Sequence, residues 1–300
     1  MKTKGKDKKT VLVTGANGFT GRYVCMELIK RQIPFIGLLR EGNDVSWFKK
    51  NNLEYRFGDI NSLEDLTIAM KGCDSIINIA SLGFGSAPNI IKACDKSGIS
   101  RSVFISTTAI FTKLNAHSKK IRENAESLIK VSNLEWTIIR PTMIYGSPKD
   151  RNLIKLIKWI DMVPFFPVFG NGENLQQPVY VRDVAWSIAE VLHNKKTYYE
   201  SFNISGRYPL SFNNLVKTTS KSLNKETILI HLPSKIFIII LKFFEYFDIK
   251  LPIKAEQIER LNEDKSFDSK KAKKIFKYDP KPFSFGIKKE IEAYLSIRNK

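Results

Sequence analysis

The sequence predicts an α/β fold: a doubly wound parallel sheet with a small, mostly helical C-terminal lobe. Three observations predict it. Apolar runs of strand length alternate with helical segments through the first part of the chain. The first run, residues 11–13, leads directly into Gly15, Gly18 and Gly21, which are evenly spaced. After Pro141, prolines and glycines interrupt the alternation, so we expect the architecture to change there.

Six strands are expected in order along this first part. They are apolar because both faces of a parallel sheet are covered, and they comprise residues 11–13, 33–39, 53–57, 74–80, 102–106 and 136–140. The helices between them include one continuing from Gly21, one beginning after Ser62, and residues 89–96 and 125–131. Ser62 is a typical N-cap and is followed by an acidic first turn. Strand–helix–strand units of this length predict right-handed crossovers and a parallel sheet.

The later part of the chain is expected to be divided between two regions. Residues 179–184 predict a short strand and residues 185–193 a helix, while the chain after residue 205 is lysine-rich and helical. We therefore expect a basic tail at residues 1–9, a first domain at 10–142 to which 179–204 return, and a lobe formed by 143–178 and 205–300.

The three glycines predict an anion site at the end of the first strand. Glycine permits steep backbone angles, close approach of the backbone to a phosphate and tight helix–strand packing. The amides at the start of the following helix then point at the anion. Because the motif lies between a strand and a helix, we favour a dinucleotide pyrophosphate over an ordinary glycine-rich turn.

Composition narrows the class of protein. The three cysteines are odd in number and form no Cys-x-x-Cys pair, so we expect neither disulfides nor a metal site, and a reducing cytoplasm. The polar start MKTKGKDKK contains no secretory signal. The formal net charge of +19 favours an anionic partner, either a nucleotide, an acidic membrane surface or a nucleic acid. The lysines are scattered, which reduces the weight of that argument.

Further motifs follow the carboxyl ends of the predicted strands, where ligands bind in open α/β sheets. They are residues 14–21 (TGANGFTG), 58–59 (GD), 78–80 (NIA), 106–109 (STTA), 140–142 (RPT) and, later, 179–184 (VYVRDV). Together they resemble the extended, atypical short-chain dehydrogenases/reductases of the nucleotide-sugar epimerase/dehydratase type. Two members have simpler interpretations: Asp183 as a helix N-cap and Arg140-Pro141 as a strand terminator.

This resemblance implies a Rossmann domain and roles for individual residues. Thr107 would hold the position of the family's catalytic Ser/Thr, which hydrogen-bonds the reacting oxygen. Asp59 has two interpretations: it contacts the cofactor, or it caps the next helix. The residues expected to bind the cofactor are Gly15, Asn17, Gly18, Phe19, Gly21, Arg40, Asp59, Ile60, Ala80 and Pro141.

The choice of cofactor depends on the end of the second strand. An acidic residue there would bind the ribose hydroxyls of NAD, whereas a cation suits the 2′-phosphate of NADP. The strand ends in Arg40, with Glu41 beside it and Arg22 just after the glycines. We therefore favour NADP(H) over NAD(H); the alternative is that Arg40 is an ordinary surface residue.

The family's Tyr-x-x-x-Lys pair is missing. Counting back from Ala125-Glu126 places Arg122 at the lysine position and Ser118 at the tyrosine position, and residues 112–126 contain no tyrosine. Arginine holds its proton too firmly to serve as a tunable acid. Lys119 and His117 are the candidate substitutes, each competing with a role as a solvent-exposed residue.

Three hypotheses about function follow. The first is an NAD(P)-dependent epimerase- or reductase-like enzyme for a sugar nucleotide or a polyprenol-linked sugar. The second is a dinucleotide-binding sensor or structural subunit without turnover, and the third, the weakest, is an RNA-binding relative without an RNP-like aromatic motif. A homodimer is left open. The candidate substrate contacts, which compete with ordinary loop polarity, are Arg151, Asn152, Gln176 and Gln177.

Residues 233–247 (PSKIFIIILKFFEYF) are the most apolar stretch of the chain. The stretch is shorter than the roughly 20 residues that span a bilayer, and charged residues interrupt it. The favoured interpretation is a core helix of the lobe. The alternative is an interfacial helix at the inner face of the membrane, since lysines flank it at Lys235, Lys242, Lys250 and Lys254.

Overall fold

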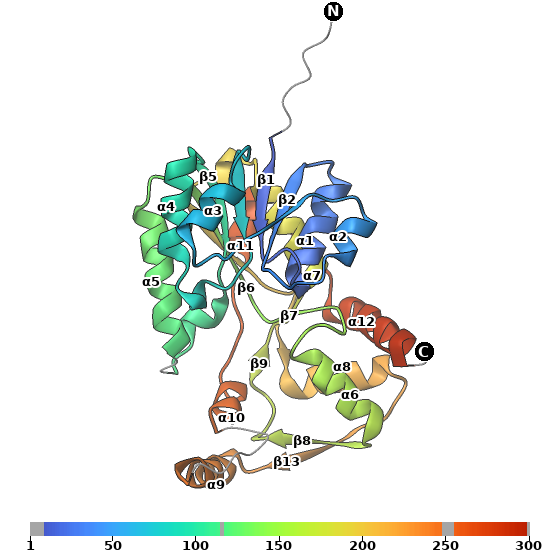
Figure 1. Ribbon diagram of the computed structural model, residues 1–300. Coiled ribbons are helices and arrows are strands. Elements are labelled where there is room, and N and C mark those ends of the chain that lie inside the picture. The colour runs from blue at the N-terminus through green and yellow to red at the C-terminus, as the bar shows by residue number, and fades with distance from the viewer. Residues whose placement is uncertain (1–8, 115–116, 248–254, 299–300) are drawn as a thin grey trace, which may run out of the picture. The chain divides into compact units, whose positions relative to one another are not determined.

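The computed structural model describes residues 9–114, 117–247 and 255–298, and the chain forms two compact units (Figure 1). The first unit contains the chain up to Pro141 together with Val181–Ile204 and Ser269–Asp279. The second contains Thr142–Tyr180, Ser205–Asp268 and the chain from Pro280 onward. The expected lobe included all of 205–300. The structure instead assigns Ser269–Asp279 to the first unit.

The first unit is built on a seven-stranded parallel sheet in the order β11-β6-β5-β4-β1-β2-β3. Most of its strand residues are buried and many are β-branched or aromatic, as expected for strands covered on both faces. The predicted doubly wound α/β fold is therefore confirmed. The strands are β1 (Val11–Thr14), β2 (Phe35–Leu39), β3 (Tyr55–Phe57), β4 (Ser75–Asn78), β5 (Arg101–Ile105), β6 (Glu135–Pro141) and β11 (Glu200–Ile204).

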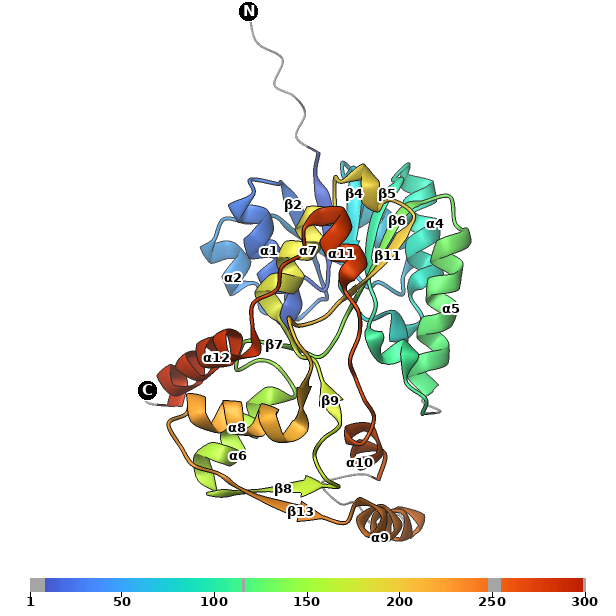
Figure 2. The same ribbon diagram turned by 180° about the vertical axis from the view of Figure 1, so that it is seen from behind.

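Helices cover both faces of this sheet. One face carries α1 (Phe19–Lys30), α7 (Val181–Val191) and α11 (Lys270–Phe276), seen in front of the sheet in Figure 2. The other carries α3 (Leu63–Ala69), α4 (Ala87–Ser97) and α5 (His117–Val131). The short α2 (Ser46–Lys50) and the 3₁₀ turns η1 (Leu82–Phe84), η2 (Thr108–Phe111) and η3 (Lys195–Thr197) complete the unit. Ser62 caps α3 as predicted, accepting a hydrogen bond from Asp65 N.

After residue 141, two predictions are wrong and one strand was not predicted. The expected strand at 179–184 shrinks to the two residues of β10 (Val179–Tyr180), which pairs with β7 outside the main sheet. Helix α7 already begins at Val181, so Asp183 lies in its first turn rather than at its N-cap. The seventh strand of the sheet is β11, which the sequence analysis missed because apolar and polar residues are mixed in ESFNI.

The second unit is mostly helical, as predicted, and also contains short strands. Three small two-stranded sheets pair β7 with β10, β9 with β12, and β8 with β13. Helix α8 packs against α6 and α12, and α9 packs against α10. The elements not yet given are β7 (Ile144–Tyr145), α6 (Leu153–Met162), β8 (Phe165–Phe169), β9 (Leu175–Gln176), β12 (Leu210–Ser211), α8 (Phe212–Ser222), β13 (Ile228–Leu232), α9 (Ser234–Tyr246), α10 (Ala255–Leu261) and α12 (Phe283–Arg298).

The order of the main sheet determines where a ligand would bind. The chain moves outward from β1 to β2 and β3 on one side, and through β4, β5 and β6 on the other. This reversal beside β1 is a topological switch point, where the loops after β1 and β4 diverge from the carboxyl edge of the sheet. The glycine turn after β1 lies at that point.

Candidate functional site

The glycine turn joins β1 to α1, and its geometry requires at least two of its glycines. Gly15 has φ +65°, a left-handed conformation that other residues adopt at a cost. A Cβ on Gly21 would overlap the Gly15 carbonyl oxygen, because α1 packs directly against the turn. At Gly18 a Cβ would lie 3.2 Å from the same oxygen, a tight contact rather than an overlap. The glycines therefore have different roles: Gly15 and Gly21 shape the turn, and Gly18 keeps its surface bare.

The start of α1 is suited to an anion. Gly18 is the N-cap and provides no capping side chain, and the first turn contains no acidic residue. The helix begins at Phe19, so the amides of its first turn lie within the glycine motif. An uncapped helix N-terminus with a bare turn before it fits a pyrophosphate group.

The turn also lies close to the end of β4. A Cβ on Gly15 would lie 3.0 Å from Ala80 N, so only glycine allows the two loops to approach so closely. Thr14 Oγ1 donates to Asn78 Oδ1 (2.7 Å) and accepts weakly from Ala80 N (3.4 Å), while Asn78 Nδ2 donates to Ala80 O (3.0 Å). This buried network fixes the edges of β1 and β4 relative to each other. The sequence analysis did not identify Asn78 as the residue that connects them.

Asn17 and Phe19, both predicted cofactor residues, have protein contacts of their own. Asn17 Nδ2 donates to Asp44 O (2.9 Å), and Asn17 Oδ1 accepts from Arg22 Nη2 (2.6 Å). The Arg22 guanidinium also lies 5.3 Å from the centre of the Trp47 ring. These contacts connect the glycine turn to the loop after β2. Phe19 packs edge-on against Tyr23.

Of the residues expected near the adenosine half, Arg40 and Asp59 are exposed. Arg40 follows β2 and, like its neighbour Glu41, has an exposed side chain. Asp59 Oδ1 accepts from Asn61 N (2.9 Å), which makes a local turn, so the capping of α3 is left to Ser62. Ile60 is partly buried against the core. The alternative role of Asp59 as a helix cap is thereby excluded.

Thr107 lies two residues after the end of β5 and caps the turn η2, with Oγ1 accepting from Ala109 N (3.2 Å). Pro141 is the last residue of the neighbouring strand β6, and its carbonyl oxygen lies 3.4 Å from Thr108 Oγ1. The two predicted residues thus lie at the carboxyl ends of adjacent strands.

A buried ion pair supports this edge. Arg140 Nε donates to Glu126 Oε1 at 2.9 Å, and its Nη2 bonds the other carboxylate oxygen. Burial raises the pKa of Glu126, but hydrogen bonds from Arg140 and Ser106 outweigh that effect and keep its pKa below the ordinary value. Arg140 therefore anchors α5 to β6, a role that its position before Pro141 had not revealed.

Helix α5 carries Lys119 and His117, the two residues that the sequence analysis named as candidate proton donors. Lys119 Nζ donates to Thr112 O (2.8 Å), which holds the ammonium over the loop before the helix. The Arg122 guanidinium lies about 3.1 Å from where a Cβ of Gly83 would be, and Nη1 donates to Ser118 O. His117 is the first residue of α5, and its side chain lies outside the described part. An arginine thus lies against the loop after β4.

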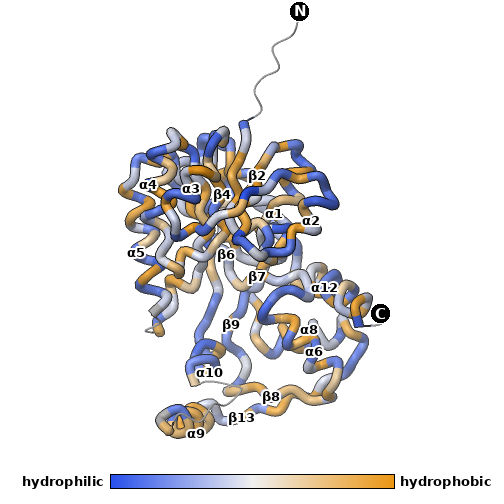
Figure 3. Tube along the Cα trace, viewed as in Figure 1, coloured by the Kyte–Doolittle hydropathy of each residue, from blue (hydrophilic) through white to orange (hydrophobic). Residues whose placement is uncertain are grey.

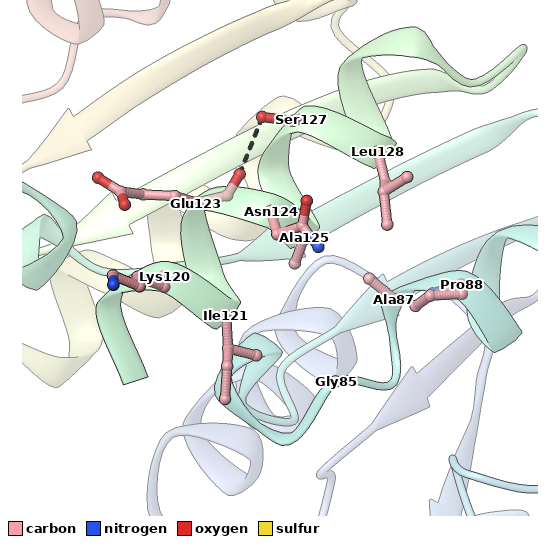
Figure 4. Close-up of a pocket in the computed structure, with 10 residues that line it drawn as sticks. All are labelled: Gly85, Ala87, Pro88, Lys120, Ile121, Glu123, Asn124, Ala125, Ser127 and Leu128. Atoms are coloured by element: carbon pink, nitrogen blue, oxygen red, sulfur yellow. Dashed lines mark hydrogen bonds between the residues drawn. The ribbon is translucent and has the colours of Figure 1, made fainter. Parts of the chain in front are cut away.

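A groove of about 580 Å³ runs between the start of α4 and α5 (Figure 4). Its lining includes Gly85 and Pro88 on one side and α5 from Lys120 to Leu128 on the other. Ser127 Oγ donates to Glu123 O within it (3.0 Å). None of the predicted cofactor residues lines this groove. We therefore place the candidate site at the glycine turn.

The predicted substrate residues lie in the second unit and differ in availability. Gln177 uses both ends of its amide on backbone, donating to Gly206 O (2.7 Å) and accepting from Phe267 N (2.8 Å). Gln176 is buried and donates to Glu263 O (3.5 Å). Arg151 and Asn152 are exposed in the loop before α6. The glutamines therefore brace the unit, and only the loop pair presents polar side chains outward.

That loop is held by two buried carboxyl groups that the sequence analysis missed. Asp150 Oδ1 accepts from Asn152 N (2.8 Å), and Glu290 Oε2, from α12, accepts from Gly146 N (2.7 Å). Their other oxygens, Asp150 Oδ2 and Glu290 Oε1, are buried without another hydrogen-bond partner among the described residues, and the Asp150 carboxyl group lies close to that of Glu290. Burial first, and then this contact with Asp150, raises the pKa of Glu290 to about 10. A shared proton between two buried carboxyl groups therefore fixes the loop.

Other reactive chemistry is scarce. Among the residues that the structure describes, no group of three His, Cys, Asp or Glu side chains is placed to hold a metal ion. Burial raises the pKa of the Cys25 and Cys94 thiols to about 12 and that of Cys73 to about 11, so none is a ready nucleophile.

Comparison with known proteins gives consistent relatives. The chain is 26% identical over 260 residues to the N-acetyl-α-D-glucosaminyl-diphospho-ditrans,octacis-undecaprenol 4-epimerase of Escherichia coli O157:H7, covering 74% of this chain and 75% of that protein. It is 22% identical over 334 residues to the UDP-glucose 4-epimerase of Vibrio cholerae, covering 98% of each. The UDP-glucose 4-epimerase structure from Thermotoga maritima has the same fold, with a TM-score of 0.76, 16% identity, and coverage of 96% of this chain and 99% of that one.

The family assignment rests on the part of the chain that carries the site. Residues 15–195 match the pattern of a family described as NAD(P)H-binding. The match begins at the first glycine of the turn and extends beyond α7, so it covers more than half of the chain. Together with the epimerase relatives, it confirms the resemblance to atypical short-chain dehydrogenases/reductases. The chain belongs to the NAD(P)H-binding family.

Proposed function

We propose that the protein is an NAD(P)-dependent epimerase- or reductase-like enzyme that acts on a sugar nucleotide or a polyprenol-linked sugar. The observation that carries the proposal is the glycine turn at the switch point of the sheet, with an uncapped helix behind it. The substrate class is supported by two relatives, one named for an undecaprenol-linked sugar and one for UDP-glucose.

The residues after β5 supply the chemistry at the sugar. A nicotinamide cofactor supplies a reversible hydride acceptor for a carbon that bears a hydroxyl group. Thr107 Oγ1 accepts from Ala109 N, and this contact does not consume the hydroxyl proton. That proton can therefore hydrogen-bond the reacting sugar oxygen, a contact worth most as charge develops on that oxygen. Lys119 and His117 are proposed to exchange the substrate proton in place of the missing tyrosine.

NADP(H) is the proposed cofactor. The proposal is supported by Arg40, an exposed cation at the end of β2, which suits a 2′-phosphate. Calorimetric titration of both cofactors tests this. We expect tighter binding of NADP(H) and loss of the preference in Arg40→Ala. Equal affinities in the unmodified protein would refute it.

Substrate contact is proposed for Arg151 and Asn152. They are exposed on a loop that the Asp150–Glu290 pair holds in place, so their side chains can turn toward a phosphate or a hydroxyl group. Gln176 and Gln177 are better explained by their backbone contacts.

The main alternative is a cofactor-binding protein without turnover. It is favoured by one observation, the presence of Ser118 and Arg122 where the family has its tyrosine and lysine. A panel of nucleotide sugars and polyprenol-linked sugars, supplied with either cofactor, separates the two functions. We expect turnover that falls about 100-fold in Thr107→Ala while cofactor affinity is nearly unchanged. Cofactor binding with no turnover on the whole panel would favour the alternative. A separate measurement of RNA binding tests the third hypothesis.

A further inference from the structure

Helix α9 is apolar on two faces, and the second unit covers one of them. Leu241 is 8% exposed and forms a small cluster with Ala255 and Ile258 of α10, against which Phe237 and Ile238 pack. This inner face packs on α10, within the second unit. The interfacial alternative concerned the other face.

The outer face carries an uninterrupted apolar stripe. Ile236, Ile239, Ile240, Phe243 and Phe247 follow one another at helical spacing, and all five are exposed, Ile239 by 68% and Phe243 by 60%. The rings of Phe243 and Phe247 lie 4.9 Å apart, so they form one surface. An exposed apolar stripe of this kind is typical of a surface that contacts a partner or a membrane.

Further exposed apolar side chains lie on two strands of the same unit. Ile228 and Ile230 of β13 and Phe165 of β8 are also exposed, with Ile228 and Phe165 directly paired. Figures 1 and 2 show α9, β8 and β13 at the same end of the second unit, and Figure 3 shows that these segments are largely hydrophobic.

Two lysines of α9 lie beside the stripe, and one of them is paired with a carboxylate. Lys235 is exposed beside Ile236, and Lys242 is exposed with its Nζ 2.7 Å from Glu259 Oε1. The flanking Lys250 and Lys254 lie outside the described residues. The chain as a whole has a formal net charge of +19. No helix among the described residues is long and apolar enough to cross a membrane.

We propose that the outer face of α9 lies in the surface of an anionic lipid bilayer, with the helix parallel to it. Apolar side chains bordered by lysines match the boundary where acyl chains meet phosphate headgroups. Binding of a second copy of the chain to this face would explain the apolar stripe but would not require the lysines beside it. The inference rests on the proposed function in one respect, since a polyprenol-linked sugar is itself held in a membrane.

The test uses the full chain, without cofactor or sugar, in flotation with vesicles of phosphatidylcholine alone or with phosphatidylglycerol added. We expect binding to the anionic vesicles that weakens with added salt, and about a tenfold loss in Ile239→Ser/Phe243→Ser. Both substitutions are on the exposed stripe, so folding is preserved; Phe244 is half-buried and unsuitable. The matched control is Ile68→Ser/Val131→Ser, which removes two exposed apolar side chains from α3 and α5.

Each outcome decides the proposal. No flotation of the unmodified protein, equal flotation of the α9 variant, or equal binding to neutral vesicles would overturn it. A dimer that dissociates in the α9 variant, seen by sedimentation, would assign the stripe to a second copy. Turnover of a soluble nucleotide sugar is measured separately, so a failure of the proposed enzyme function is distinguishable from a failure of membrane contact.

Discussion

Replacing Glu290 by glutamine should raise stability at neutral and alkaline pH. In the folded chain Glu290 and Asp150 share a proton, whereas both carboxyl groups are ionised in the unfolded chain above its ordinary pKa of 4.5. The folded pKa is the raised one, so the contribution of the pair is fully present below pH 4.5. It is lost as pH rises toward 10. A glutamine amide is neutral at every pH and can donate to Asp150 while its oxygen accepts from Gly146 N.

The size of the effect follows from proton linkage. One extra proton bound in the folded state changes the free energy of unfolding by about 1.4 kcal/mol per pH unit. Between pH 5.5 and 8.5, the unmodified protein should therefore lose up to about 4 kcal/mol relative to the variant. This holds whichever of the two carboxyl groups carries the proton, because the pair titrates together.

Urea unfolding of both proteins at three pH values in this range measures the difference. Glu292→Gln is the matched control, since it removes an exposed carboxylate two residues further along α12, one paired with Lys289. Its stability relative to the unmodified protein should change little with pH. Asp150→Asn should reproduce the Glu290→Gln result from the other side. If the unmodified protein and Glu290→Gln show parallel pH dependence, the shared proton does not exist.

Three further predictions concern other parts of the chain. Gly18→Ala should fold and lose cofactor binding at least tenfold by calorimetry, because its Cβ is tolerated beside Gly15 O but covers the phosphate surface; Gly21→Ala should instead lower the melting temperature. Equal folding defects in both would contradict this division. Asp161 is held by Lys225 (2.8 Å), Tyr294 (2.9 Å) and Arg298, which keep its pKa at about 2. Asp161→Asn should therefore lower the free energy of unfolding at pH 7 by about 1–2 kcal/mol, after allowing for the exposed partners. The difference from the unmodified protein should vanish as pH falls from 4 to 2, since stability from a lowered carboxyl pKa is lost on acidification; a difference that persists there refutes the assignment. Arg101→Lys should cost roughly 3 kcal/mol in urea unfolding, because the buried guanidinium donates to several backbone carbonyls that one ammonium cannot reach, and a change below 1 kcal/mol would show that it can.

Local sequence patterns were sufficient to predict the strands of the first unit up to β6, but not the short helix α2 or the start of α5. The glycine turn, the Ser62 cap and the buried strands all depend on residues within a few positions of each other. At residues 179–184 the same method failed, because a short apolar run fits a buried strand and a buried helix equally well. The chain there starts α7, and Val181 and Val184 face the core of the first unit.

The parts of the site that depend on distant residues could not be predicted. Asp150 and Glu290 are 140 positions apart, and each looks like an ordinary surface acid in its own segment. Gln177 had the composition of a substrate contact, yet it bonds backbone at Gly206 and Phe267. No pattern within a single sequence distinguishes a polar side chain that faces solvent from one that braces a neighbouring loop. Helix α11 is similar, since contacts with distant residues attach it to the sheet: Phe276 packs on Phe202, and Lys271 pairs with Glu200.

The three-segment composition of the first unit determines the order in which it can be completed during synthesis. Its edge strand β11 pairs with β6 only after residue 204 has been made, and the helix that packs on β11 ends at Phe276. A fragment ending at Pro141 would therefore present β6 as an unpaired edge strand. Such an edge can pair with other chains and lead to aggregation. Nascent chains consequently carry this unpaired edge through much of translation, and protection by a chaperone would matter most in that interval.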